Sequence, residues 1–462
     1  MRSRYARRFA VAIAVIAMCT FSMPVPRVVA GGSDVLDRIR AVAGVLSVEE
    51  SDSTIPGTRF FRVEFAQPVD HANPAGPMFR QRLTILHRDV SAPTVLEING
   101  YYVFPDSVQY ELTALLQANQ IHVEHRYFIP SRPDPVDWQF LNIAEGAADD
   151  HEIVQAFKTI YGAKWVSTGA SKGGMASVYF RYFYPGDVDA TVPYVAPSSH
   201  GTMDPRYVGF VAGLGSAKCR KKLVAFQRRA LKKRAKLARY MGDGPYDILG
   251  KDRALEFAIL EMPFVLWQYN DASLCDAIPG AGATSRQIYD FLDRIVFVQS
   301  YGDEALTAFE PYYYQSATQL GGPAVGELGL EDLLRYPGED GPEILPPQDV
   351  PKTFDPTVMP LIEQFVLDDA ERVLFIYGAN DPWSTNAFSV NADNDSYRLF
   401  VTGRAGNHQS QILDLADADR SFALGKIGEW LDAPIAQVSS TERVSNPRYR
   451  IDRPTRNELF LR

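Results

Sequence analysis

A serine surrounded by glycines stands between two apolar stretches. Ser171 lies in the run Gly-Ala-Ser-Lys-Gly-Gly at residues 169–174, after a predicted strand and before a predicted helix. A turn tight enough to need these glycines exposes the serine hydroxyl at the end of the strand. The backbone N–H of Lys172 then points to the place where an oxyanion would form. An ordinary glycine-rich turn is the other interpretation, and the run alone leaves both open.

A serine hydroxyl needs a base, and in strand-turn-helix sites of this kind an acid and then a histidine follow the serine in the chain. The sequence has seven histidines, and His408 is the only one in the second half. It follows a predicted strand at residues 397–401. Asp381 follows another at residues 372–377, and active-site groups of open α/β sheets lie at the carboxyl ends of strands. Order and placement therefore predict a triad of these two residues with Ser171.

Other kinds of chemistry fit the sequence less well. Lys172 is followed by glycine rather than by serine or threonine, which argues against a phosphate-binding loop, and residues 213–215 are too short for a dinucleotide fingerprint. His151 and Glu152 lack the second histidine of a zinc-peptidase helix, and no other metal-ligand spacing occurs. We therefore expect no metal and no cofactor.

The predicted elements that carry these residues form one sheet. Strand-like runs occur at residues 60–67, 82–89, 93–100, 121–128, 164–171 and 190–197, and again at 372–377 and 397–401. The early runs are adjacent, as in antiparallel meanders, whereas helical spacing at residues 108–119 and 138–161 separates later ones, as in parallel βαβ units. A further helix is expected from about residue 410 to 430. The fold class is therefore α/β, with helices on both faces of the sheet.

A helical insertion interrupts this pattern. Helical spacing without a clear strand run predominates from residue 207 to 314, and a loop rich in proline and acids follows at residues 336–356. We predict a sheet domain in two parts, 31–198 and 354–435, an insertion with its return loop at 199–353, and a polar tail at 436–462.

The most basic part of the chain lies in this insertion. Residues 218–239 contain eleven Lys or Arg and no acid, and the spacing of Leu223, Phe226, Ala230 and Leu237 predicts one buried helix face. A solvated basic side is one interpretation, and contact with nucleic acid or a membrane is the other.

The first 30 residues have the pattern of an export signal. Arginines at positions 2, 4, 7 and 8 precede an apolar run at residues 9–23, and small residues end the segment at Ala30. A retained anchor, or a lipoprotein signal through Cys19, is the alternative. The chain carries a net charge of −9, and the first 30 residues hold five arginines and no acid, so the remainder carries −14. Such a surface repels polyphosphate, and we expect neither a nucleic-acid partner nor stable membrane contact.

Two cysteines remain beyond the predicted signal. In an exported protein Cys219 and Cys275 most simply form one disulfide, which would close a 57-residue loop. Two buried free thiols are the alternative.

Five stretches of the sequence also resemble a known family. They are FAQPVDHANPAGPMFRQR (65–82), VEHRYF (123–128), GASKGGMASVYFRYFYP (169–185), YGANDPWS (377–384) and GNHQSQILDL (406–415). Together they resemble the exported bacterial tripeptidyl aminopeptidases and, more distantly, prolyl carboxypeptidase and dipeptidyl peptidase II. The resemblance implies an α/β-hydrolase fold with a helical cap inserted before Asp381. It also implies Ser171 as nucleophile with Asp381 and His408 as partners, and exopeptidase action on peptide substrates.

One turn departs from the distant relatives, which carry Asn-Glu-Gly there. Here it is Asn-Gly-Tyr-Tyr at residues 99–102, so the second oxyanion donor cannot be copied, and we assign it to the N–H of Tyr101. Glu97 and Glu124 are candidates for binding the substrate's amine, although a glutamate in a strand more often pairs with a cation such as Arg126 or faces water.

A cap would restrict the site to chain ends and short peptides. Its aromatic residues Trp267, Tyr269 and Tyr312 to Tyr314 either line the pocket or pack the cap core. The main expectation is a secreted serine exopeptidase acting at peptide N-termini. The alternatives are a carboxylic-ester hydrolase, a prolyl-specific di- or carboxypeptidase, and a non-catalytic binding protein on the same scaffold.

Overall fold

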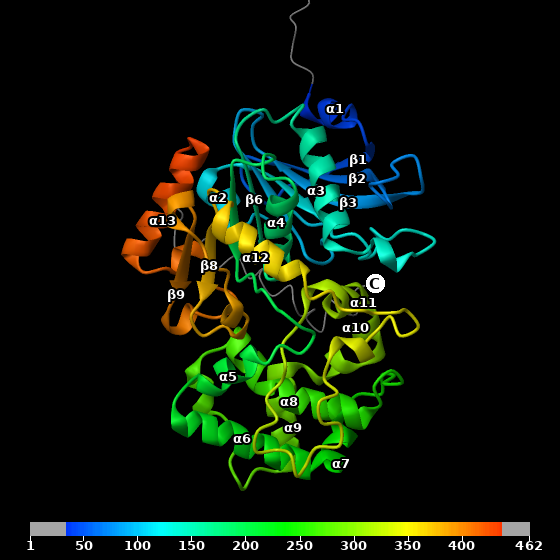
Figure 1. The fold of residues 1–462 in the computed structure, drawn as a ribbon, viewed down its shortest axis with the longest axis vertical. Coiled ribbons are helices and arrows are strands. Elements are labelled where there is room, and N and C mark those ends of the chain that lie inside the picture. The colour runs from blue at the N-terminus through cyan, green and yellow to red at the C-terminus, as the bar shows by residue number, and fades with distance from the viewer. Residues whose placement is uncertain (1–33, 437–462) are drawn as a thin grey trace, which may run out of the picture.

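The structure is a computed structural model that describes residues 34–436. The predicted export signal at residues 1–30 lies outside the described residues, as does the predicted tail beyond residue 436. The described chain forms a sheet domain, in the upper part of Figure 1, and a helical lobe below it.

Nine described strands form one mixed sheet in the order β1-β2-β3-β5-β4-β6-β7-β8-β9. Their bounds are β1 Val45–Ser51, β2 Arg59–Pro68, β3 Met78–His87, β4 Thr94–Ile98, β5 Asn119–Val123, β6 Trp165–Ala170, β7 Ala190–Tyr194, β8 Leu374–Gly378 and β9 Tyr397–Val401. Strands β1, β2, β3 and β5 pair antiparallel, and those from β5 across to β9 pair parallel. The meander and the βαβ units predicted from the sequence both form.

Helices cover both faces of the sheet. On one face lie α1 (Val35–Arg40), α3 (Ile143–Phe157), α4 (Lys172–Phe183) and α12 (Val358–Asp368), and on the other lie α2 (Glu111–Leu116) and α13 (Asp417–Leu431). The two faces follow from strand alternation, because Leu96 packs with the α3 side and its neighbour Val95 with the α2 side. The central strands β4, β7 and β8 are buried along their whole length, as parallel strands between helix layers must be.

Four elements differ from the sequence-based expectation. Strand β1 and the helices α1 and α12 were not predicted. Helix α1 buries only Val35 and Ile39, too few apolar positions for a clear period. The last helix begins at Asp417 rather than near residue 410, because residues Ile412–Asp414 form a separate 3₁₀ turn.

The segment between β7 and α12 folds as the helical lobe, here called the cap. It contains α5 (Arg206–Gly213), α6 (Ala217–Lys232), α7 (Arg234–Leu237), α8 (Lys251–Tyr269), α9 (Ser285–Val296), α10 (Asp303–Ala308) and α11 (Glu310–Gln315). A hydrophobic core of its own, with Phe226, Leu255, Trp267 and Leu292, joins these helices. The predicted disulfide is confirmed, since Cys219 in α6 is bonded to Cys275.

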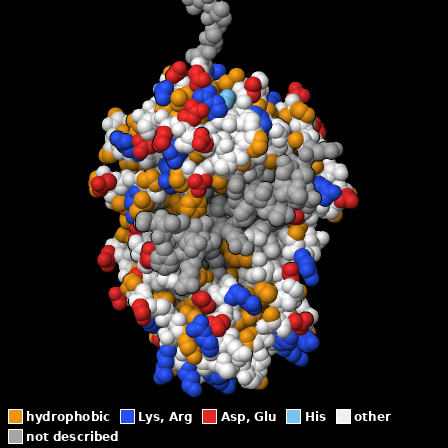
Figure 2. Space-filling model, turned by 180° about the vertical axis from the view of Figure 1, so that it is seen from behind, with side chains coloured by type: hydrophobic (Ala, Val, Ile, Leu, Met, Phe, Trp, Pro, Cys, Tyr) orange, Lys and Arg blue, Asp and Glu red, His pale blue; other side chains and the backbone are white. Residues whose placement is uncertain are grey.

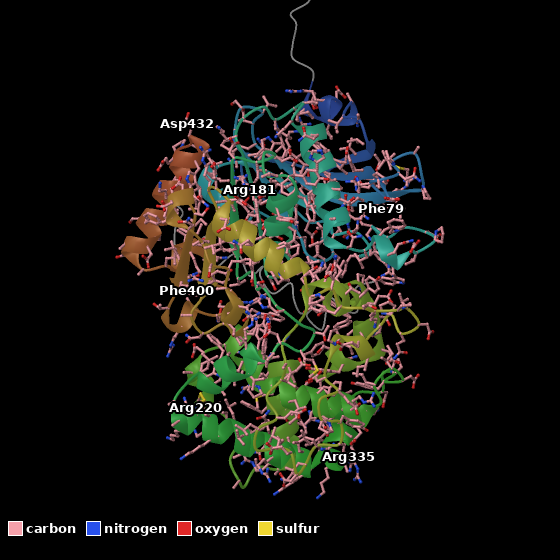
Figure 3. The ribbon with its side chains drawn as sticks, viewed as in Figure 1. Phe79, Arg181, Arg220, Arg335, Phe400 and Asp432 are labelled. Atoms are coloured by element: carbon pink, nitrogen blue, oxygen red, sulfur yellow. A yellow bond between two sulfur atoms is a disulfide. The ribbon has the colours of Figure 1, made fainter. Side chains whose placement is uncertain are left out.

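The basic run of the cap forms α6 and α7. All four residues of the predicted apolar face are buried. The basic side stabilises the cap itself, through Lys222 with the Cys275 carbonyl, Arg228 with Asp332, Arg229 with the Pro279 carbonyl, Lys233 with the Ala283 carbonyl and Arg234 with Glu256. Figure 2 shows the Lys and Arg side chains gathered at this end of the molecule, and Figure 3 labels Arg220 and Arg335 there.

Within residues 34–436, no helix combines the length and the apolar character needed to cross a bilayer.

Candidate active site

Ser171 occupies a strained turn between β6 and α4. Its φ of 56° and ψ of −124° are unusual for a residue with a side chain, and such strain is concentrated at functional sites. The neighbouring glycines permit the turn because a Cβ on Gly173 would lie 2.4 Å from the Ile98 carbonyl oxygen, and one on Gly169 would lie 2.5 Å from that of Gly173. The sequence therefore allows α4 to start against the ends of β4 and β6.

The predicted acid and base meet beyond the ends of β8 and β9. His408 Nδ1 lies 2.8 Å from Asp381 Oδ2, and both side chains are buried. The two loops approach closely because Gly378 ends β8, where a Cβ would lie 2.4 Å from the Asn407 carbonyl oxygen. The bond to Asp381 orients the imidazole ring and turns its Nε2 atom away from the carboxylate.

A buried glutamate anchors the loop that follows His408. Glu111 in α2 accepts hydrogen bonds from the backbone N–H groups of Ile412 and Leu413, each at 3.0 Å, and from the Tyr194 hydroxyl. Burial raises the pKa of Glu111 to about 7. The role of Glu111 could not be predicted from the sequence, because Ile412 and Leu413 lie 301 and 302 positions after it in the chain.

The cap also contacts the histidine. The backbone N–H of His408 donates to the Gln268 carbonyl oxygen in α8 at 2.9 Å, and the ring of Tyr269 lies edge-on to the imidazole at 6.1 Å between centroids. On the sheet side, the Trp383 ring lies 6.2 Å from it. His408 therefore sits where the sheet domain meets the cap.

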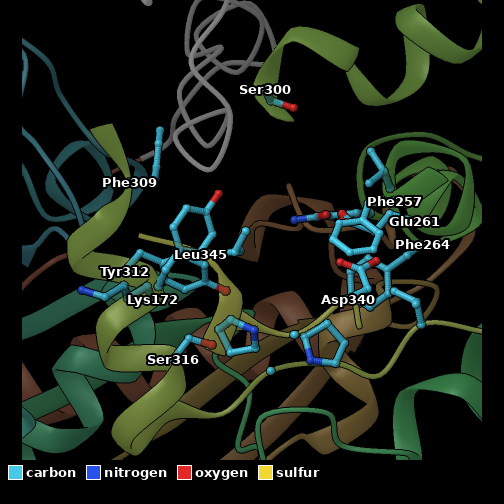
Figure 4. A pocket seen from close by; sticks show the side chains of 18 of the residues that line it. Lys172, Phe257, Glu261, Phe264, Ser300, Phe309, Tyr312, Ser316, Asp340 and Leu345 are labelled. Carbon is cyan, nitrogen blue, oxygen red and sulfur yellow. The ribbon is translucent and has the colours of Figure 1, made fainter. Parts of the chain in front are cut away.

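A cavity of about 240 Å³ lies at this junction. Ser171, Lys172 and Trp383 line it from the sheet domain, and the cap contributes mainly aromatic and apolar side chains, with Phe257, Phe264, Phe309 and Tyr312 among them (Figure 4). Of the predicted pocket aromatics, Tyr269, Tyr312 and Tyr313 line the cavity. Trp267 packs in the cap core instead, and Tyr314 packs against Trp138, with ring centroids 5.2 Å apart.

The sequence is similar to those of known proteins. Residues 29–456 match the family described as PS-10 peptidase S37. The chain belongs to that family. It is 38% identical over 426 residues to the prolyl tri/tetrapeptidyl aminopeptidase of Streptomyces mobaraensis, covering 90% of this chain and 88% of the relative. The S37 chain is therefore a serine peptidase, as the sequence analysis predicted.

Solved structures resemble this S37 peptidase only at low similarity. Proline iminopeptidase of Mycobacterium smegmatis is 12% identical, with a TM-score of 0.35, over 79% of this chain and 98% of that one. Epoxide hydrolase A of Mycobacterium thermoresistibile is 13% identical, with a TM-score of 0.33, over 85% and 99%.

The side chain of Lys172 has a structural position that the sequence analysis did not consider. Its Nζ donates to the Gly100 carbonyl oxygen at 2.5 Å and lies over the rings of Tyr101 and Phe128, 5.6 and 5.5 Å from their centroids. Burial lowers the pKa of this ammonium well below its usual value. A lysine without neighbouring acids at the start of an apolar helix was the available signal. The Lys172 side chain ties the serine turn to the turn after β4.

The predicted oxyanion donors differ in their surroundings. Lys172 is the first residue of α4, where backbone N–H groups have no partner within the helix. The N–H of Tyr101 instead donates to Asn99 Oδ1 at 2.9 Å within its own turn. This bond conflicts with our assignment of Tyr101 as the second donor.

Neither glutamate predicted to bind the substrate's amine lines the cavity that Ser171 lines. Glu124 is buried and already bonded, to Arg82 rather than to Arg126, and also to the Ser131 hydroxyl and the Val103 N–H. Glu97 is buried inside β4, where burial raises its pKa to about 8. The two residues fail for different reasons, because Glu97 lies inside β4, whereas Glu124, just beyond β5, is already bonded to Arg82 and Ser131.

Proposed function

We propose that this S37 chain is a secreted serine exopeptidase that releases short peptides, three or four residues long, from peptide N-termini. The observation that carries the proposal is that Ser171 lines a partly open cavity that the cap covers. The length of the product follows the name of the Streptomyces relative. The predicted export signal and the Cys219–Cys275 disulfide support secretion.

The geometry supports a triad mechanism. Ser171 Oγ attacks the scissile carbonyl carbon while His408 Nε2 accepts its proton, and Asp381 stabilises the imidazolium through Nδ1. The N–H of Lys172 donates to the oxyanion of the tetrahedral intermediate. His408 then gives the proton to the departing amine, and the N-terminal fragment stays on Ser171 as an ester. A water molecule, deprotonated by His408, hydrolyses that ester.

The cap accounts for exopeptidase rather than endopeptidase action. The cap covers Ser171 with aromatic side chains, and the cavity that it leaves is too small for a folded polypeptide. The segment that enters must therefore be a chain end or a short peptide.

A fluorophosphonate probe followed by a peptide library with mass readout tests the proposal. We expect labelling at Ser171 and products three or four residues long that carry the original N-terminus. Products from the C-terminus would instead support a carboxypeptidase. Turnover of a matched ester without cleavage of any peptide would support an ester hydrolase, and absence of labelling and turnover would support a non-catalytic protein.

A further inference from the structure

Two acidic side chains lie on the cap wall of the cavity. Among its described lining residues, Glu261 of α8 and Asp340 of the return loop are the acids, and Lys172 is a cation. Figure 4 shows Glu261 and Asp340 beside Phe257 and Phe264, across the cavity from Lys172. An otherwise aromatic cavity thus has acidic character at the wall that faces the serine turn.

Asp340 is in an unfavourable position for a carboxylate without a cation. Asp340 as a whole is half-buried, but its Oδ2 atom is fully buried and has no hydrogen-bond partner among residues 34–436. Burial, together with the charges of Glu261 and Glu327, raises its pKa well above the usual value. Buried polar atoms are rarely left unbonded, and an unpaired buried charge is costly. The described chain leaves this oxygen without a hydrogen-bond donor, and a cation placed beside it would favour the ionised carboxylate.

The cations around Asp340 are committed elsewhere. Lys172 donates to the Gly100 carbonyl on the opposite side of the cavity. Arg253 pairs with Glu339, the residue before Asp340, at 3.1 Å near the surface. Nothing in the described chain forms an ion pair with Asp340, so a cation that enters the cavity would meet an acidic wall.

We propose that Glu261 and Asp340 bind the α-ammonium group of the peptide substrate, which sets how many residues are released. This inference rests on the proposed function. An extended segment of three or four residues spans about 10 to 14 Å, so its ammonium group must meet a wall other than the one that carries Ser171. The ammonium supplies a donor and a positive charge for the unbonded oxygen of Asp340, and Glu261 adds negative charge at the same wall.

The test compares one peptide with a free N-terminus and the same peptide N-acetylated, in the wild type and in Asp340→Asn and Glu261→Gln. We expect each substitution to lower kcat/KM for the free peptide by about 10- to 100-fold, the range for a charge-assisted hydrogen bond, and to leave the acetylated peptide within about twofold. Glu339→Gln is the matched control. It removes the same charge one residue away, outside the cavity lining, and we expect no change in the ratio of the two rates.

The outcomes separate this inference from the proposed function. Equal rates for the two peptides in the wild type would show that the amine is not recognised, which contradicts the proposed N-terminal action. A wild type that prefers the free amine, with the preference unchanged in both variants, would overturn the inference alone. Fluorophosphonate labelling rates identify any variant that fails to fold, and the second variant then decides.

Discussion

The two ends of the cavity are built in different ways. At the sheet end, Ser171 lines the cavity, and the buried pair of Asp381 and His408 is not part of the lining. Each of the three residues follows a parallel strand, and hydrogen bonds from buried groups hold their loops. At the cap end, aromatic rings and two acids come from helices and a long loop that a separate core supports. In the proposed function, the sheet end supplies the groups for chemistry that every peptide bond needs. The cap end supplies the surface that can distinguish one peptide from another.

This difference predicts that substitutions at the sheet end stop turnover of all substrates, whereas those at the cap end change the choice among substrates. It also predicts that the cap can lose stability by itself. The four experiments below test the chemistry of the sheet end and the stability of the two regions. The comparison of free and acetylated peptides described above tests the choice among substrates.

The largest effect is expected for Ser171→Ala, which should lower kcat by something on the order of 10⁶ for every substrate while the melting temperature stays close to that of the wild type. Asp381→Asn should lower kcat by on the order of 10⁴, because the carboxylate that orients His408 is lost. Steady-state kinetics on purified protein measures both. Near-normal turnover in purified Ser171→Ala would remove the sheet end from the chemistry.

The next effect concerns the disulfide. Replacing Cys219 and Cys275 together by serine should cost about 4 kcal/mol in the chain-entropy account of a 57-residue loop. The bond lies wholly within the cap, so hydrogen exchange should accelerate in α6 and α8 before it does in the central strands.

Intact mass of the exported protein, alkylated without reductant, is the control for the disulfide. Two alkylated thiols would refute the bond. Equal acceleration of exchange in the cap and in the sheet would show instead that the two regions unfold as one.

A smaller effect is expected from the pH dependence of the sheet domain. Burial raises the pKa of Glu97 to about 8, so its protonated carboxyl contributes stability that is full below its unfolded value near 4.5 and is lost as pH rises through about 8. Facing it in register are His122, whose pKa burial lowers to about 3, and Thr168. The wild type should lose roughly 3 kcal/mol relative to Glu97→Gln between pH 5 and 8.

Denaturant unfolding at both pH values measures this loss. Glu49→Gln, at an exposed position of β1, is the control and should follow the wild type. A Glu97→Gln protein with the same pH profile as the wild type would contradict a buried neutral carboxyl.

The smallest effect is expected for Lys172→Met. The ammonium holds the Gly100 carbonyl against the serine turn, and its loss should lower kcat by about 10- to 100-fold with KM changed less than about threefold, since alignment of the turns is lost rather than a substrate contact. Lys158→Met removes a similar bond, from Nζ to the Asp187 carbonyl, away from the cavity, and should leave kcat unchanged. A change in KM alone would make Lys172 a substrate contact instead.

The sequence was sufficient for the residues whose positions follow from local rules. Ser171 needed its glycines, and Asp381 and His408 needed only strands before them and the correct chain order. The parallel strands then bring all three to one edge of the sheet. The S37 match and the observed Asp381–His408 bond agree with that reasoning.

The residues that the sequence did not identify depend on tertiary packing. Glu111 meets Ile412 only after the whole sheet has formed, and Asp340 meets Glu261 only when the return loop folds over α8. Glu97 and Glu124 failed as amine-binding candidates for the opposite reason. Glu97 lies in a strand interior, which is shielded from the cavity, and the carboxylate of Glu124 is already bonded to Arg82 and Ser131.

The hydrogen bond from the His408 N–H to the Gln268 carbonyl joins the loop that carries the histidine to the end of α8 in the cap. Any movement that lifts the end of α8 to admit a peptide must break it, and any movement that restores it also reseats the imidazole loop. With His408 as the proposed general base, one hydrogen bond joins its loop to the roof of the cavity. We therefore expect a polypeptide that displaces α8 to meet a less firmly held base than a short peptide that fits beneath it.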